Sequence, residues 1–312
     1  MRRAFIRTLV ELAERDPRVL LLVGDLGFMT VEPFAQRFPD RFFNMGVAEQ
    51  NMMGVATGLA EAGYIPFVYS IVPFAVLRPY EFIRHGPILH KFPVRIVGVG
   101  GGVEYGPEGA THYGLEDVGV LRVQPGMTII APADHEQARR ALQASWDLPG
   151  PVYYRLGKDD ETTIPGLSGS FSLGRSQLVR DGADVLLVAM GNVGTEAVKA
   201  AQLLDTKHIS CALVIMASVS PRPTRDLLDV LSRFPVVLTI EEHYITGGVG
   251  SLVSEVVAEH GLTCRVVRCG VKDAPDGVTG SHAYMRRRCL ISSEAIAETA
   301  VIALLDNGRK EG

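Results

Sequence analysis

Long hydrophobic runs and paired cysteines are both missing from this sequence. No apolar stretch reaches the roughly 20 residues of a membrane-spanning helix. The N-terminal residues lead into an amphipathic helix that has neither a signal-peptide core nor a cleavage site. The cysteines show no C-x-x-C spacing, which favours a reduced compartment over a disulfide framework or a zinc site. They are Cys211, Cys264, Cys269 and Cys289. We therefore expect a cytoplasmic protein without a membrane span.

A strong excess of charge of one sign is also absent. The 31 basic and 35 acidic residues give a net charge of −4, and the one dense basic run covers only residues 286–288. A general nucleic-acid or membrane-surface partner would need a larger basic patch. The sequence contains no P-loop, no H-E-x-x-H, no G-x-S-x-G and no G-x-G-x-x-G that opens a helix after the first strand. These absences leave a small molecule as the expected substrate.

The residues that are present predict an α/β fold. Short apolar runs, typical of strands buried on both faces, alternate with helical patterns along the whole chain. We expect two doubly wound domains with mainly parallel sheets, at residues 1–160 and 176–312. Residues 161–175 are rich in Asp, Thr, Ser, Gly and Pro and form the expected linker. Two helices are expected in particular, one over 73–91 with a possible break at 86–87, and one over 134–146 capped by Asp134.

The chain is organised around residues 44–60. This stretch predicts a strand end, a tight turn at Gly46 and a helix with Asn44 as its cap, and small residues dominate the later helix. Glu49 stands at the start of that helix. One interpretation is a first-turn acid that complements the helix dipole. The other is a functional carboxyl group that apolar neighbours hold nearer its neutral form, ready to share a proton with a ligand nitrogen.

Further polar groups follow the ends of other predicted strands of the first domain. Open parallel sheets bind ligands at the carboxyl ends of their strands. A long glycine-rich loop at 100–112 carries Glu108 and His112, and long loops of this kind are often functional. Arg155 ends another strand. The cluster at 241–243 (Glu, Glu, His) is interpreted as a polar strand end, because no third metal ligand is evident, and no metal site is predicted in this chain.

Together these residues resemble the transketolase family of thiamine-diphosphate enzymes, over nearly the whole chain. The Gly46-x-x-Glu49 helix start is similar to the family's activating-glutamate motif. Residues 239–243 and 247–251 are similar to its C-terminal domain. The loop is similar to the family's G-x-[DE]-G-x-T-H segment, and here it reads Gly106-Pro107-Glu108-Gly109-Ala110-Thr111-His112.

The resemblance implies a half enzyme. Full-length members carry a further N-terminal domain, which holds the cofactor diphosphate through Mg²⁺ and has a G-D-G motif that this chain lacks. The chain would then be the pyrimidine-binding domain plus the C-terminal domain of a split transketolase. Its implied partner is an N-terminal transketolase-like subunit that holds most of the diphosphate and Mg²⁺. The implied assembly is an α2β2 heterotetramer in which this chain also contacts itself, and the chain alone is expected to be inactive.

The resemblance also implies roles for particular residues. Glu49 would hydrogen-bond a ring nitrogen of the cofactor's aminopyrimidine and favour its imino tautomer. His112 would contact the substrate's hydroxyl or carbonyl oxygen. Glu108 occupies the position of an acidic residue that contacts a sugar hydroxyl in the family. Arg155 occupies the position of an arginine that binds a substrate phosphate. The activity implied is transfer of a two-carbon ketol or acyl unit from a ketose or 2-oxo donor to an aldehyde.

Two positions depart from the family pattern. Val72 aligns with the aromatic residue that stacks on the aminopyrimidine, and Phe74 lies near that position but would need a shift. Loss of a stacking ring would remove about 1 kcal/mol of binding free energy. Gly100 replaces a histidine that often binds sugar phosphates, so the acceptor need not be a standard pentose phosphate.

Two alternatives stay open at this stage. The beta subunit of a 2-oxo acid dehydrogenase shares the two-domain architecture, although the Thr111-His112 pair favours the transketolase side. A non-catalytic homologue that serves as a scaffold is the other alternative. Val72 favours the scaffold, whereas an intact Glu49 argues against it.

Overall fold

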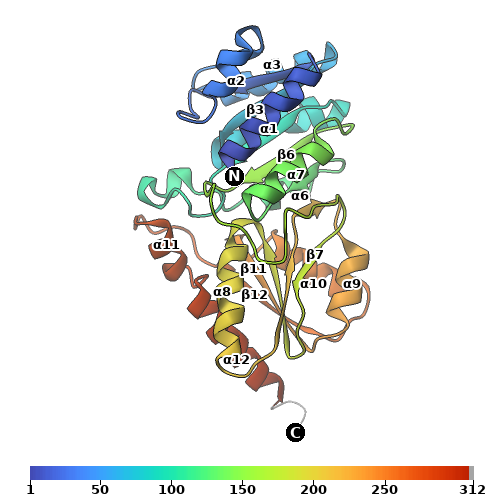
Figure 1. Ribbon diagram of the computed structural model, residues 1–312, viewed down its shortest axis with the longest axis vertical. Coiled ribbons are helices and arrows are strands. Elements are labelled where there is room, and N and C mark those ends of the chain that lie inside the picture. Colours follow the sequence, from blue (N-terminus) through green and yellow to red (C-terminus); the bar gives the residue numbers. More distant parts are fainter. Residues whose placement is uncertain (309–312) are drawn as a thin grey trace.

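The computed structural model describes residues 1–308. Figure 1 shows two α/β halves stacked along the long axis, with the N-terminus near their junction and α12 (Ser293–Gly308) at the far end of the second half. Each half is built on its own sheet. The predicted fold class, α/β with two mainly parallel doubly wound sheets, is confirmed.

The first sheet has seven strands in the order β10-β5-β6-β4-β3-β1-β2. All neighbouring strands in it are parallel except β10, which comes from the second half and runs antiparallel to β5. Three of its strands are buried along their whole length: Val19–Val23 is apolar throughout, whereas Arg95–Val99 and Val152–Leu156 each bury one arginine. The strands are β1 (Val19–Val23), β2 (Phe42–Asn44), β3 (Ile65–Ile71), β4 (Arg95–Val99), β5 (Thr128–Ile130), β6 (Val152–Leu156) and β10 (Ser218–Ser220).

Helices cover both faces of the first sheet. α1 and α7 pack together on one face, where Phe5 and Leu142 join the same apolar cluster, and α3 covers the other face through Met52 and Met53. The helices are α1 (Arg2–Arg15), α2 (Glu32–Arg37), α3 (Glu49–Glu61), α4 (Val72–Val76), α5 (Tyr80–Ile83), α6 (Asp117–Arg122) and α7 (His135–Ser145). Single helical turns are η1 (Pro39–Arg41), η2 (Arg84–Ile88), η3 (Gly106–Glu108) and η4 (Ala110–His112).

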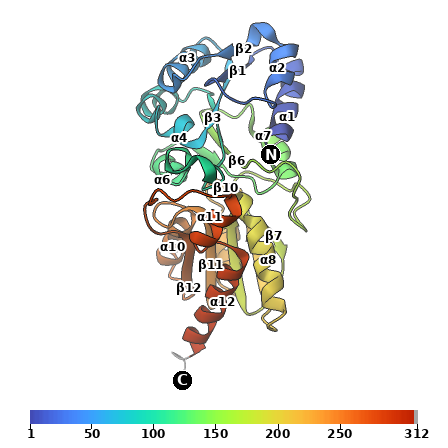
Figure 2. The ribbon, with the colours of Figure 1, turned by 90° about the vertical axis from the view of Figure 1, so that its left-hand side faces the viewer.

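The second sheet has five strands in the order β12-β11-β8-β9-β7, and only β7 is antiparallel to its neighbour. Figures 1 and 2 show α8 and α12 side by side on one face, with α9 and α10 on the other. The strands are β7 (Gln177–Arg180), β8 (Val185–Met190), β9 (Cys211–Ile215), β11 (Val236–Tyr244) and β12 (Arg265–Val271). The helices are η5 (Gly191–Val193), α8 (Gly194–Asp205), α9 (Thr224–Leu231), α10 (Val249–Glu259), α11 (His282–Arg288) and α12.

The expected long helix over 73–91 is wrong. The segment divides into α4, α5 and the π-helical turn η2, with the first break at residues 77–79. Pro79 lacks an N–H donor and restricts the residue before it, so a continuous helix cannot pass this point. The break places Arg78 between two helical turns, at the carboxyl edge of the first sheet.

One of the two predicted helix N-caps is confirmed and the other is wrong. Asp134 caps α7 as expected and accepts a hydrogen bond from the Gln137 N–H. Asn44 does not cap α3, which has Ala48 at its N-cap position and no side-chain cap. The Asn44 side chain instead accepts from the Gly46 N–H, because the left-handed backbone of Gly46 (φ 69°) turns the chain back toward it.

Candidate active site

Glu49 is the first residue of α3, at the carboxyl edge of the first sheet. Its side chain is only 2% exposed. Oε1 accepts a hydrogen bond from the Ser70 hydroxyl at 3.3 Å, and Oε2 accepts from Arg78 Nη1 at 2.9 Å. The expected apolar surroundings are therefore wrong, because a cation and a hydroxyl group face this buried carboxylate.

Arg78 joins Glu49 to Phe74. The guanidinium carbon lies 3.9 Å from the centroid of the Phe74 ring, within the range of a cation–π contact. The same guanidinium makes the ion pair with Glu49. Phe74 is half-buried, and Arg78 lies over one face of its ring.

His112 also contacts Phe74. The two rings meet edge to face with centroids 5.1 Å apart, and the Tyr105 ring lies 5.9 Å from His112. The Thr111 hydroxyl is 2.9 Å from His112 Nδ1. Within residues 1–308, His112 Nε2 makes no hydrogen bond and is free to meet a ligand oxygen.

Gly24 leaves the Glu49 carboxylate without a side chain over it. A Cβ atom at Gly24 would lie 3.2 Å from Glu49 Oε1 and 3.4 Å from the Ser70 hydroxyl, so the absence of a side chain at Gly24 keeps the carboxylate approachable. A carboxylate and an aromatic face side by side can hold a planar ring that carries hydrogen-bonding nitrogens. This donor set is the one that the pyrimidine half of thiamine diphosphate requires.

The other predicted ligand-binding residues have different surroundings. Val72 is completely buried, and its methyl groups pack against Gly98 and Gly114. Glu108 lies on η3 with an exposed side chain, in the same loop as His112. The structure therefore brings Glu49, Phe74 and His112 together and leaves Val72 beneath the surface.

Arg155 is buried at the junction of the two halves. Its Nε donates to Asp117 Oδ2 at 2.8 Å, and its Nη2 donates to the carbonyl oxygens of Gly114 and Glu242, both at 2.9 Å. Burial alone would lower the pKa of Arg155, but the Asp117 carboxylate raises it. The predicted phosphate clamp stays a prediction, and these contacts give it no support because the guanidinium already has protein partners.

Sequence reasoning missed Arg78 as a site residue. The available signal is the four-residue spacing between Phe74 and Arg78, which on a helical turn brings a cation over a ring. The ion pair of Arg78 with Glu49 has no such local signal, because it joins two elements that are distant in the sequence.

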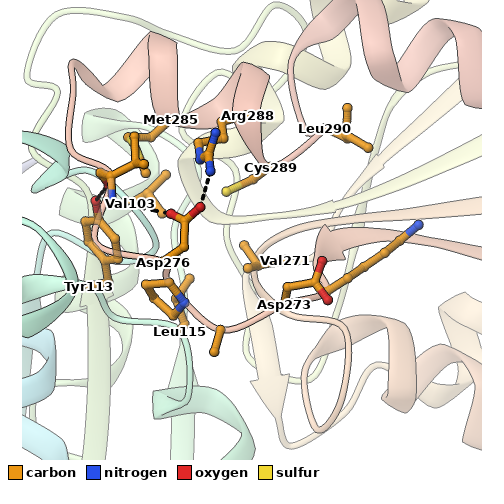
Figure 3. A pocket seen from close by; sticks show the side chains of 14 residues that line it. Val103, Tyr113, Leu115, Val271, Asp273, Asp276, Met285, Arg288, Cys289 and Leu290 are labelled. Carbon is orange, nitrogen blue, oxygen red and sulfur yellow. Dashed lines mark hydrogen bonds and ion pairs between the residues drawn. The ribbon is translucent and has the colours of Figure 1, made fainter.

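The loop that carries His112 is supported by the second half of the chain. Gly280 N–H donates to the Gly106 carbonyl oxygen at 3.3 Å, and the Tyr113 hydroxyl contacts the carbonyl oxygens of Gly106 and Val278. A cavity of about 320 Å³ is lined by residues of both halves, among them Tyr113 and Leu115 from the first and Met285 and Cys289 from the second, as Figure 3 shows. The position of His112 thus depends on both halves.

Residues 1–308 offer neither a cluster of metal ligands nor a membrane-spanning helix. No group of three or more His, Cys, Asp and Glu side chains is arranged there to hold a metal ion. No helix in that range is long and apolar enough to cross a membrane.

Comparisons with known protein families match both halves. Residues 1–161 match the model of the transketolase pyrimidine binding domain, and residues 174–296 match that of the transketolase C-terminal domain. The chain therefore belongs to the transketolase family.

Individual relatives indicate which kind of transketolase-family protein this chain resembles. A putative transketolase C-terminal section from Methanocaldococcus jannaschii is 36% identical over 88% of this chain and 86% of its own length. One subunit of an apulose-4-phosphate transketolase from Actinobacillus succinogenes is 34% identical over 87% of each chain. A solved structure described as a split gene transketolase, inactive beta4 tetramer, superposes with a TM-score of 0.86 at 34% identity and covers 97% of both chains. This chain is accordingly a split transketolase-like subunit, one part of a heteromeric transferase.

Proposed function

We propose that this chain carries the pyrimidine-binding half of the active site in a split, thiamine-diphosphate-dependent transketolase. The enzyme would transfer a two-carbon ketol unit from a ketose or 2-oxo donor to an aldehyde acceptor. The observation that carries the proposal is the buried Glu49 carboxylate, which the Arg78 guanidinium links to the ring of Phe74 and beside which Gly24 has no side chain.

Each site residue has its own role in this reaction. Glu49 shares a proton with a ring nitrogen of the bound aminopyrimidine, and Phe74 rather than Val72 supplies the stacking face. His112, oriented by Thr111, directs Nε2 to a substrate oxygen, and Glu108 faces a substrate hydroxyl from the same loop. When bound, thiamine diphosphate supplies the electron sink that cleavage of the carbon–carbon bond requires. The two halves of this chain hold the loop of His112 in place and so fix the substrate relative to Glu49.

Exposed apolar side chains beside Glu49 support a partner subunit. Phe28 is 90% exposed, and Met29 and Val47 are also largely exposed on the loops that precede α2 and α3. A hydrogen bond of 2.9 Å from the Asn44 amide to Asp25 Oδ1 joins these two loops. Apolar groups gathered at the edge of a site are typical of an interface. We propose that the partner covers this edge and holds the diphosphate and Mg²⁺.

We propose a 2:2 assembly in which α3 also contacts a second copy of this chain. The outer surface of α3 is formed by Gly54, Val55 and Gly58, next to the partly exposed Phe82. Small residues on that surface let another backbone approach closely. We also propose a cytoplasmic location, which the four free cysteines support.

The test is reconstitution with an N-terminal transketolase-like subunit from the same organism. Wild type, Glu49→Ala and Glu61→Ala are compared. Calorimetry measures the binding of thiamine diphosphate and Mg²⁺ to each protein. Turnover is then measured with ketose phosphates and with 2-oxo acids. Glu61 ends the same helix and is exposed, so its variant is the matched control.

We expect Glu49→Ala to reduce turnover by at least about a hundredfold, because a positioned proton-transfer group contributes roughly 10²–10⁴ in rate. Glu61→Ala should behave as wild type, and sedimentation should give a 2:2 complex. Unchanged turnover in Glu49→Ala would exclude the proposed mechanism. Turnover with 2-oxo acids alone, with transfer to a lipoyl group, would favour the dehydrogenase alternative.

A further inference from the structure

The guanidinium of Arg78 lies between Glu49 and Phe74. One group makes both contacts: Nη1 is 2.9 Å from Glu49 Oε2, and Cζ is 3.9 Å from the centroid of the Phe74 ring. A group that touches the carboxylate and the ring face at the same time fills the space between them. This is the space that the proposed function assigns to the aminopyrimidine.

A guanidinium and an aminopyrimidine offer the same kinds of contact. Both are flat, both present N–H donors in their plane, and both stack on an aromatic face. The two groups therefore compete for the same carboxylate oxygen and the same side of the ring. From this competition we propose that Arg78 is a stand-in for the cofactor, and that it must leave Glu49 and Phe74 before thiamine diphosphate can bind. The proposal rests on the proposed function.

The two partners of the ion pair differ in freedom to move. Glu49 is 2% exposed and fixed at the start of α3, whereas Arg78 is 43% exposed and lies in the break between α4 and α5. Its one hydrogen bond within residues 1–308 is the one to Glu49. Arg78 can thus rotate into solvent without any change in the apolar core.

Displacement of Arg78 has a cost that sets the affinity of this half-site. The ion pair is made to a buried carboxylate, and the cation–π contact adds to it, so the two together are worth on the order of tenfold or more in a binding constant. The isolated chain should consequently bind the cofactor poorly even though Glu49, Phe74 and Gly24 are already in place. Arg78 is a residue that determines cofactor affinity without taking part in the chemistry.

The test is calorimetric titration of thiamine diphosphate with Mg²⁺ into wild type, Arg78→Ala and Arg84→Ala. Each full-length protein is titrated twice, once alone and once mixed with the partner subunit. Arg84 is an exposed arginine six residues further along the same segment and has no contact with Glu49, which makes it the matched control. The melting temperature of each apo protein is measured with and without the cofactor.

We expect the two readouts to move in opposite directions. Arg78→Ala should lower the apo melting temperature, because it leaves Glu49 buried without its cation, and should raise cofactor affinity about tenfold. Its cofactor-induced rise in melting temperature should exceed that of wild type, and Arg84→Ala should match wild type. Should Arg78→Ala not fold, Arg78→Lys, which keeps a charge but loses the flat stacking group, should show a smaller gain in affinity.

The outcomes separate this inference from the proposed function. Equal or weaker cofactor affinity in the folded Arg78 variants, together with normal binding by wild type and partner, would overturn the stand-in role and leave the function intact. Absence of binding by wild type in the presence of the partner would instead contradict the function. A purely structural arginine would lower both stability and affinity, which is the opposite pattern.

Discussion

At the scale of single residues, Phe74 and Val72 compete for the role of the stacking ring. Phe74 is half-buried beside His112, and Val72 packs beneath the surface against Gly98 and Gly114. Only a side chain that reaches the space near Glu49 can touch a ligand there. The structure therefore favours Phe74, although the alignment of the motif favours Val72.

Replacement of each residue distinguishes the two assignments. Phe74→Leu should weaken thiamine diphosphate binding by about fivefold, since a stacking ring contributes about 1 kcal/mol, and should change the unfolding free energy little. Val72→Ala should cost about 1–3 kcal/mol of unfolding free energy as a core truncation and leave the dissociation constant of the folded complex unchanged. Calorimetry and urea unfolding measure both quantities. The reverse pattern would return the stacking role to Val72.

The contacts of Arg78 and Arg155 show where residue-level prediction from sequence ends. Glu49 and His112 were predicted because each follows a recognisable local pattern, at a helix start and in a glycine-rich loop. The ion pair of Arg78 with Glu49 joins positions 29 residues apart, and that of Arg155 with Asp117 joins positions 38 apart. Such pairs depend on packing between elements, which local periodicity does not contain.

At the scale of elements, the sequence predicted the buried strands well and the segment after β3 poorly. Unbroken apolar runs identify β1 and β8, because a strand covered on both faces has no polar side. The segment 72–88 has apolar residues at helical spacing, yet Pro79 and Pro87 divide it into three short turns. β10 was not predicted at all, because its three residues gain their partner only when the second half packs on the first.

The loop of η3 and η4 provides a prediction at this scale. Gly106 packs directly on the Gly280 carbonyl group, and a Cβ atom at position 106 would overlap with that oxygen. Gly106→Ala should therefore push η3 and η4 away from the 278–280 segment and displace His112. We expect at least a tenfold loss of turnover in the reconstituted enzyme, because a misplaced group loses its alignment with the substrate. Cofactor affinity should stay within twofold of wild type, since Glu49 and Phe74 lie on other elements.

Gly126→Ala is the control for this loop variant. Gly126 also belongs to a loop of the first half, and nothing lies within 4 Å of the position that its Cβ would take. Its positive φ of 84° adds backbone strain that affects stability but not the site. Full turnover in Gly106→Ala would mean that the second half does not position the loop of His112.

At the scale of the whole molecule, the two halves meet across a buried charge network. Glu242, at the end of β11, accepts from His282 Nε2 at 2.6 Å and from Arg286 at 3.0 Å, while its backbone carbonyl accepts from Arg155 of the first half. Nearby, Glu104 of the first half accepts from the Asn192 amide of the second half. The predicted division at residues 160 and 176 stays a prediction, but these contacts join the two halves into one unit.

The network makes stability depend on pH in a direction that its contacts define. Burial alone would raise the pKa of Glu242, but Arg286 and His282 hold that pKa far below its ordinary value. Burial alone would lower the pKa of His282, but the Glu242 carboxylate raises it above 6.5. The stabilisation from Glu242 is present above pH 4.5 and is lost only in strong acid. That from His282 is complete below pH 6.5 and is lost as the pH rises through its raised value.

Replacement of His282 by a neutral donor tests this reasoning. The unfolding free energy of wild type should fall as the pH rises above 6.5, relative to that of His282→Gln, which can still donate to Glu242 but does not titrate. Burial also raises the pKa of Glu104, which faces the same network. Glu104 is present in both proteins, so its contribution to the pH dependence of stability is the same in each. Urea unfolding at several pH values measures the difference, with His85→Gln, an exposed histidine far along the chain, as the control. Parallel pH profiles for wild type and His282→Gln would show that folding does not shift the pKa of His282, and would contradict a stabilising ion pair between His282 and Glu242.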